Sequence, residues 1–155
     1  MATRARSLAP VLGADSDLLD AAAWLHDIGY ASGLDATGLH ALDGARYLRD
    51  AQHADAMRCR LVAYHSYAIV EAAERGLADV LALDFEPAPD DLSAVLTYCD
   101  MTTSPDGELV RVERRLAEIH QRYGPGHLIS RSILRATPLI LDAVEQVYHR
   151  AARTV

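Results

Sequence analysis

An imidazole and a carboxylate stand side by side in an apolar run, as His26 and Asp27 within residues 24–29. Both side chains are good ligands for a divalent metal, and both are costly to bury without a partner. A second carboxylate, Asp100, ends another apolar run at residues 92–99. We expect two helices to bring these groups together, because a metal ion would explain why acids lie beside core positions.

Two further histidines lie at predicted helix ends, His40 at the start of one helix and His65 near the end of another. Taken singly, each is typical of a partly buried, hydrogen-bonded histidine, and a lone His-Asp pair is typical of a polar helix end facing water. Four such positions, each at a helix terminus beside core residues, favour a shared metal site. The other histidines lie in polar or helix-surface contexts, where we expect no ligand role. They are His53, His120, His127 and His149.

Three further residues are candidates for contact with an anionic substrate. Arg46 and Arg49 lie one or two helical turns after His40. Tyr30 follows the glycine after the His-Asp pair, where it can line the mouth of the site.

A denser arginine cluster occurs at residues 111–115, but glutamates are interspersed with it at helical spacing. That cluster is a candidate for contact with an anionic substrate, but we favour its interpretation as a solvated face in which the arginines pair with the glutamates.

Composition is that of an ordinary globular domain. The chain has 155 residues, 50% of them hydrophobic, which is enough to bury a substantial core. Its net charge of −7 argues against extended nucleic-acid binding, which needs a basic face. No run is long and apolar enough to span a membrane, and the N-terminus does not read as a signal peptide. Cys59 and Cys99 lie in apolar helical patterns, so we expect buried thiols in a reducing cytoplasm.

Helical periodicity runs through nearly the whole chain and predicts a single all-α domain. The predicted helices span about residues 3–12, 17–28, 39–51, 55–66, 68–75, 92–99, 112–123 and 128–152. Gly29 is expected to end the helix that carries His26 and Asp27. The last helical region is expected to be interrupted or kinked near Pro138.

At five positions the residues resemble the HD-domain superfamily of metal-dependent phosphohydrolases. The run 26–29, His-Asp-Ile-Gly, matches the namesake motif of that superfamily. His40, followed by Gly and Ala at 44–45, is similar to its His-x-x-x-Gly-Ala element. His65 is similar to the histidine near the following helix end, and Asp100 to the closing aspartate.

The resemblance covers about residues 3–123 and implies a compact helical bundle. Residues 100–107 also resemble a bacterial subgroup of small HD proteins. We expect an HD domain over 1–125, followed by a helical extension over 126–155 packed on the same domain. Alternatively, the extension forms a homodimer interface. The sequence does not decide between packing on the same domain and dimerisation.

The resemblance implies one or two divalent ions, with Mn, Fe, Co, Ni, Zn and Mg as candidates. His26, Asp27 and Asp100 are implied to hold a first ion. His40 and His65 are implied to hold a second, with Asp27 bridging the two as the candidate catalytic residue. Mixed histidine and carboxylate ligation favours the transition metals and zinc over Mg alone.

The activity implied is hydrolysis of a small phosphorylated substrate, a phosphomonoester or phosphodiester and commonly a nucleotide. Two other classes stay open: a non-catalytic binding or interaction module that keeps the fold, and a di-iron oxygenase. The family pattern begins with another histidine on the helix before the His-Asp motif, and none precedes His26 here. We expect that ligand just upstream of Met1 in a longer chain; the other reading is an incomplete first metal site.

Overall fold

Helices make up nearly all the regular structure of the protein. The computed structural model describes residues 1–153, except for the side chains of Pro10 and Val11. Within that part of the chain, β pairing is limited to a single bridge between Thr103 and Leu109. The predicted all-α class is therefore confirmed.

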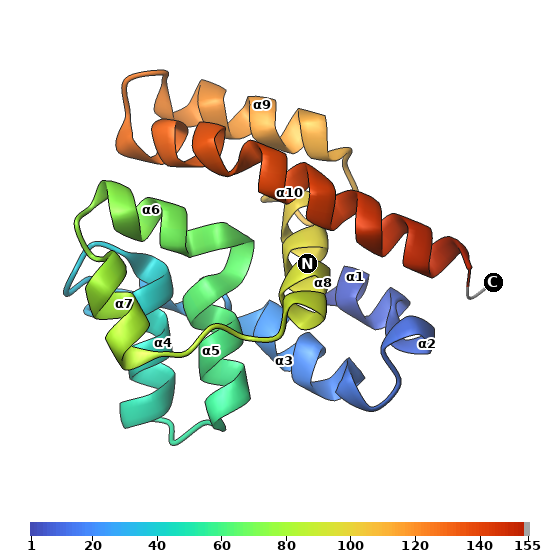
Figure 1. Cartoon of the computed structure of the whole chain (residues 1–155), viewed down its shortest axis with the longest axis horizontal. Coiled ribbons are helices and arrows are strands. Elements are labelled where there is room, and N and C mark those ends of the chain that lie inside the picture. The colour runs from blue at the N-terminus through green and yellow to red at the C-terminus, as the bar shows by residue number, and fades with distance from the viewer. Residues whose placement is uncertain (154–155) are drawn as a thin grey trace.

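Ten α-helices are described, and Figure 1 shows their arrangement. They are α1 (Ala2–Ser7), α2 (Ala9–Leu12), α3 (Ser16–Leu25), α4 (His40–Asp50), α5 (Ala56–Tyr64), α6 (Ala68–Glu74), α7 (Ala78–Asp84), α8 (Asp90–Met101), α9 (Val112–Tyr123) and α10 (Leu128–Ala152). Short 3-10 turns lie at Gly13–Asp15, Ile28–Tyr30 and His65–Tyr67.

The structure corrects three of the predicted helices and adds one. The first predicted helix is divided at Leu8 into α1 and α2, and α7 was not predicted at all. The helix expected to continue to residue 28 ends at Leu25, so His26 and Asp27 lie in the turn that follows α3. The last helix is not interrupted, because α10 continues through Pro138. Buried α10 side chains on both sides of Pro138 hold the helix in place by tertiary packing.

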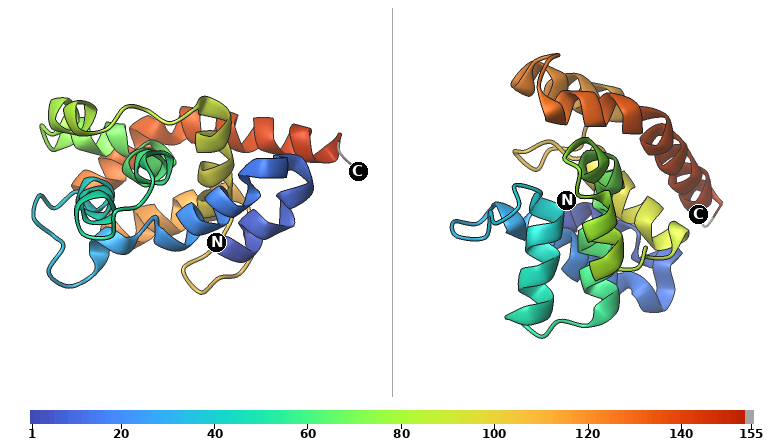
Figure 2. Two further views of the ribbon diagram at one scale, coloured as in Figure 1. Left: turned by 90° about the horizontal axis from the view of Figure 1, so that it is seen from below. Right: turned by 60° about the vertical axis from the view of Figure 1, so that its left-hand side comes forward.

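Helix α8 lies at the centre of the fold, with Val95, Leu96 and Cys99 fully buried. On one side it packs against α1 and α3, and on the other against α10. Figure 2 shows α9 and α10 lying together on one side of the remaining helices. Cys59 and Cys99 are buried free thiols, as predicted. Although α10 has 25 residues, neither it nor any other described helix is apolar enough over a sufficient length to cross a membrane.

Three groups of buried side chains form the core. The first joins α1, α3 and α8 around Leu19 and Leu96, and the second joins α4, α5 and α7 around Leu42 and Leu81. The third joins α8, α9 and α10, with members that include Met101, Ile119 and Ile140. This packing holds the ends of α3, α5 and α8 and the start of α4 around one region.

Candidate metal centre

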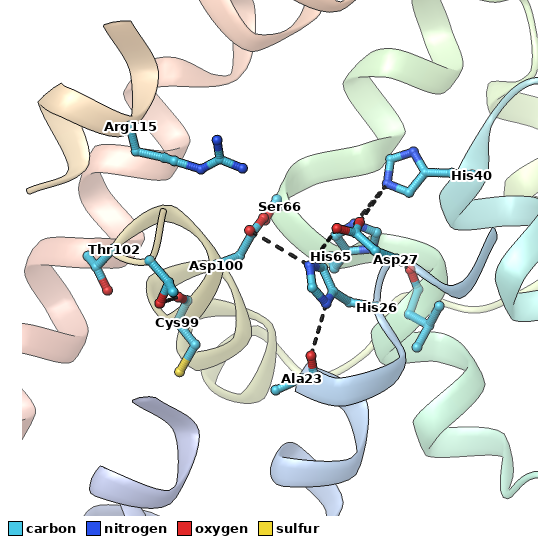
Figure 3. Close-up of polar contacts among 12 residues, drawn as sticks. Ala23, His26, Asp27, His40, His65, Ser66, Cys99, Asp100, Thr102 and Arg115 are labelled. Atoms are coloured by element: carbon cyan, nitrogen blue, oxygen red, sulfur yellow. Dashed lines mark hydrogen bonds and ion pairs between the residues drawn. The ribbon is translucent and has the colours of Figure 1, made fainter. Parts of the chain in front are cut away.

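The five ligand-type residues predicted from the sequence meet in that region (Figure 3). They are His26 and Asp27 after α3, His40 at the start of α4, His65 after α5 and Asp100 near the end of α8. Four of these side chains are largely buried, whereas that of Asp27 is 54% exposed. Asp27 is thus the member of the group most open to solvent.

One carboxylate oxygen of Asp27 faces two histidines. Its Oδ1 lies 3.4 Å from Nε2 of His40 and 3.8 Å from Nε2 of His65, and the two Nε2 atoms are 3.1 Å apart. The ligand atoms of these three residues all lie within 4.8 Å of one another. Two ligands about 2.1 Å from one ion lie about 3.0 to 3.4 Å apart at angles of 90° to 109°. Two of the three separations are therefore those of ligands of a single ion, and the separation between Asp27 and His65 is about 0.4 Å wider.

The other oxygen of Asp27 faces His26. Its Oδ2 lies 3.1 Å from Nε2 of His26, and the same nitrogen lies 3.8 Å from Oδ1 of Asp100. Asp100 is itself held by the hydroxyl of Ser66, which donates to Oδ2 at 2.5 Å. The two oxygens of Asp27 therefore point to two different groups of ligand atoms.

Two of the histidines are oriented by backbone carbonyls. Nδ1 of His65 donates to the carbonyl of Val62 at 2.7 Å, and Nδ1 of His26 donates to the carbonyl of Ala23 at 3.0 Å. A carbonyl only accepts, so the proton of each neutral ring lies on Nδ1 and the lone pair of Nε2 faces the site. Hydrogen bonding of the remote ring nitrogen is the usual way in which proteins orient a histidine that binds metal.

The protonation states also suit a cation. Burial, followed by the charge of His65, lowers the pKa of His40 to about 3. Burial, followed by the charge of His26, lowers the pKa of His65 as well, so both rings are neutral at neutral pH. Burial alone would raise the pKa of Asp27, but the hydrogen bond with His26 and the charge of His26 hold it below its usual value.

His26 behaves differently from the other two histidines. Burial lowers its pKa, but the hydrogen bond with Asp27 and the charges of Asp100 and Asp27 outweigh burial, so the pKa lies above 6.5. Without a metal, the contact with Asp27 therefore favours the protonated form of the His26 ring. A metal ligand must be deprotonated, so an ion bound by His26 would replace that proton.

Two glycines explain how the turn after α3 comes to lie against α4. A Cβ atom built at Gly29 would lie 1.9 Å from the carbonyl oxygen of His40 and 2.8 Å from the amide nitrogen of Gly44. A Cβ atom at Gly44 would lie 2.9 Å from the amide nitrogen of Gly29. The two backbones approach so closely that side chains are excluded, and this contact places Asp27 beside His40.

The turn after α5 has an uncommon backbone. Ser66 and Tyr67 adopt φ values of 48° and 60°, and neither is a glycine. Adjacent left-handed residues with side chains are strained, and such strain persists where the surrounding structure enforces it. Here the turn points His65 inward and brings the Ser66 hydroxyl to Asp100.

A cavity of about 150 Å³ adjoins the ligand group. On one side it is lined by ligand residues and by Tyr30, whose ring stacks on His40 with centroids 4.1 Å apart. Helices α9 and α10 form the other side. Their lining residues are Arg115, Ile119, Arg122, Tyr123, Ile129, Ser132, Ile133 and Ala136. The position predicted for Tyr30 thus agrees with the structure, although its role in binding stays a prediction.

The arginines at the cavity are not those predicted. Arg46 is ion-paired with Asp84 at 2.6 Å and Arg49 with Asp50 at 2.7 Å, and neither lines the cavity. Arg46 and Arg49 therefore lie outside this cavity, and their contact with a substrate stays a prediction. The interpretation of residues 111–115 as a solvated face does not hold for Arg115, which lines the cavity.

Comparison with protein families gives a match to the HD domain over residues 1–103. The match covers about two thirds of the chain, and the chain therefore belongs to the HD domain family, a superfamily of metal-dependent hydrolases. Comparison with curated proteins and with solved structures found no match.

The residues present fit the divalent metal that this family implies. Asp27 is ionised, His40 and His65 are neutral, and a backbone carbonyl holds His65 with its Nε2 directed inward. The arrangement offers an anionic oxygen and imidazole nitrogens at ligand spacing, which are the donors that Mn, Fe, Co, Ni and Zn accept.

Proposed function

We propose that the protein is a metal-dependent phosphohydrolase that acts on a small phosphomonoester or phosphodiester, with nucleotides as the first class to test. The strongest support is the convergence of Asp27, His40 and His65, whose ligand atoms lie within 4.8 Å of one another. The adjoining cavity has arginines on its opposite wall, which suits an anionic substrate.

In this proposal the chain holds up to two ions. Asp27, His40 and His65 would hold one, and Asp27, His26 and Asp100 would hold the other. A divalent ion in this position would polarise a phosphoryl oxygen and make a nearby water more acidic. The protein's own residues orient the ligands: Val62 fixes the His65 ring, and Ser66 fixes the Asp100 carboxylate.

The test begins with metal binding. Chelator-treated protein is titrated with Mn²⁺, Fe²⁺, Co²⁺, Ni²⁺, Zn²⁺ and Mg²⁺ by calorimetry, and the stoichiometry is checked by elemental analysis. Asp27→Asn and His65→Gln are expected to weaken binding by at least about 100-fold, because loss of a ligand exceeds the effect of losing its hydrogen-bonded support. His149→Gln, which changes an exposed histidine on α10, is the matched control and should bind like the wild type.

Hydrolysis is then measured with p-nitrophenyl phosphate, bis-p-nitrophenyl phosphate and a panel of nucleotides. We expect turnover that a chelator removes, that metal restores, and that Asp27→Asn abolishes. Turnover that survives chelation, or full activity of Asp27→Asn, would contradict the proposal. Tight metal binding with no turnover of any phosphate ester would favour the non-catalytic module.

A di-iron oxygenase is the second candidate, and the same arrangement of ligand atoms supports it. The two oxygens of Asp27 face separate groups of ligand atoms, an arrangement that suits two iron ions as well as a hydrolytic pair. Oxygen consumption by Fe²⁺-loaded protein, with no release of phosphate from any ester, would support that candidate over hydrolysis.

A further inference from the structure

Helices α9 and α10 form the wall opposite the ligand group, and α9 brings a positive charge to it. These helices begin after residue 103, where the family match ends, so the match assigns no role to their residues. The side chain of Arg115 is only 16% exposed and lines the same cavity as Asp27, His40 and His65. Figure 3 shows its guanidinium directed from α9 toward Asp100 and Ser66.

The guanidinium of Arg115 is held in place by one hydrogen bond, and part of its donor capacity is unsatisfied. One nitrogen, Nη1, donates to Oε2 of Glu118, one helical turn along α9. The Nε atom is buried and has no hydrogen-bond partner in the described part of the chain. A buried N–H without a partner is unfavourable, so an acceptor in the cavity would stabilise this side chain.

Glu118 does not cancel the charge on this wall. Its other oxygen, Oε1, accepts from Arg122, which also lines the cavity. One carboxylate is therefore shared by two guanidinium groups, and the trio carries a net charge of about +1. Glu118 thus orients Arg115 without neutralising the cluster.

The size of the cavity limits what can be enclosed beside Arg115. Its volume of about 150 Å³ is below the roughly 300 Å³ at which sites for drug-sized ligands begin. The space suits a phosphoryl group with a few further atoms, and Ile119, Ile129 and Ile133 give that remainder an apolar wall.

We propose that Arg115 binds the phosphoryl group of the substrate, and that the enclosed part of the substrate is a compact phosphomonoester with a small apolar substituent. This inference rests on the proposed phosphohydrolase function and extends it. A guanidinium presents several N–H donors in a fixed plane, which matches two oxygens of a phosphate. Arg115 acts here as a substrate-binding residue, and Glu118 as the residue that positions it.

The experiment measures binding rather than turnover. Inorganic phosphate and propylphosphonate, which has no ester bond to hydrolyse, are titrated by calorimetry into metal-free and Mn²⁺-loaded protein. Arg115→Gln is expected to lower the affinity for both probes by about 10- to 100-fold, as expected for loss of hydrogen bonds to a charged group. Its affinity for Mn²⁺ should stay unchanged, because Arg115 is not a ligand.

Two further variants complete the comparison. Arg114→Gln removes an exposed arginine from the adjacent position of α9 and should leave both affinities unchanged. Arg115→Lys keeps the charge but loses the planar fork, so its phosphate affinity should fall by several-fold, less than in Arg115→Gln. Arg115→Lys also keeps a cation beside Glu118, and it tests the inference if Arg115→Gln does not fold.

The outcomes separate this inference from the proposed function. If Arg115→Gln and Arg115→Lys bind phosphate and propylphosphonate as the wild type does, with Mn²⁺ affinity intact, the inference is overturned and the hydrolase proposal stands. If these variants lose phosphate affinity while the wild type hydrolyses no phosphate ester, Arg115 is an anion-binding residue and the hydrolase proposal fails.

Discussion

Replacing Gly29 with alanine tests whether a backbone contact holds the metal ligands together. The new Cβ would lie 1.9 Å from the carbonyl oxygen of His40, whereas such contacts are essentially never shorter than 3.0 Å. The turn after α3 and the start of α4 must therefore separate by about 1.1 Å, the difference between 3.0 and 1.9 Å. Ligand distances in metal sites are held to within about 0.2 Å, so the separation exceeds what the site tolerates.

The expected cost in stability follows from the same contact. Overpacking costs about 1 to 3 kcal/mol, and here the clash involves backbone atoms that cannot rotate away. The lower chain entropy of unfolded alanine returns only about 0.4 to 1 kcal/mol. We therefore expect Gly29→Ala to lower the free energy of unfolding by about 2 kcal/mol or more, and to weaken metal binding by more than about 100-fold.

Urea denaturation of chelator-treated protein and calorimetric titration with Mn²⁺ measure the two effects. Gly126→Ala is the control, because no atom lies within 4 Å of a Cβ at that position. Gly44→Ala should fall between the two variants, since its nearest contacts are 2.9 and 3.0 Å and small shifts relieve them. A Gly29→Ala protein as stable as Gly126→Ala, with unchanged affinity for Mn²⁺, would refute the reasoning.

Two further predictions concern the metal-free protein. The pKa of His40 is about 3 in the folded state and 6.5 in the unfolded state. Between these pH values the unfolded chain binds more protons than the folded protein, so the free energy of unfolding falls as the pH falls from 6.5 toward 3. Urea denaturation at pH 6.5 and 4.5 measures this effect. Between these two pH values the free energy of unfolding of His40→Gln should fall by about 1 to 2 kcal/mol less than that of the wild type. Equal losses would contradict the assigned pKa. At Ser66, alanine removes the hydrogen bond to Asp100 and should cost about 1.5 to 3 kcal/mol. Ser66→Gly loses the same bond but relieves the left-handed strain, so it should be about 1 kcal/mol more stable than Ser66→Ala; the reverse order would show that the turn is not strained.

Much of the ligand group could be predicted because each member leaves a local signal. His26, His40, His65 and Asp100 are polar residues at the ends of apolar helical runs, where a partner is needed. Their convergence was expected, but the contacts that produce it could not be predicted. These are the contact between two glycine backbones and a left-handed turn, and neither has a periodic pattern in the sequence.

Arg115 was assigned to a solvated face because its neighbours suggest that environment. An arginine three residues before a glutamate is typical of a solvated helix face. Arg115 and Glu118 have this spacing, and the spacing is the same whether the ion pair faces water or a cavity. A usable signal was present: Arg115, Ile119 and Arg122 recur at steps of four and three residues and so share one stripe of α9. The helix ends were harder still, since α3 ends three residues earlier than periodicity predicted.

The two walls of the cavity have different origins in the chain. The wall with the ligand-type residues lies within residues 1–103, and the facing wall comes from α9 and α10, which supply none of those five residues. Substitutions of cavity-lining residues in α9 and α10 can therefore change the shape of the cavity without removing a ligand. In the proposed enzyme, selection for a new substrate and selection for a retained reaction would act mainly on separate stretches of the gene, and these stretches are joined through the core group around Met101 and Ile140.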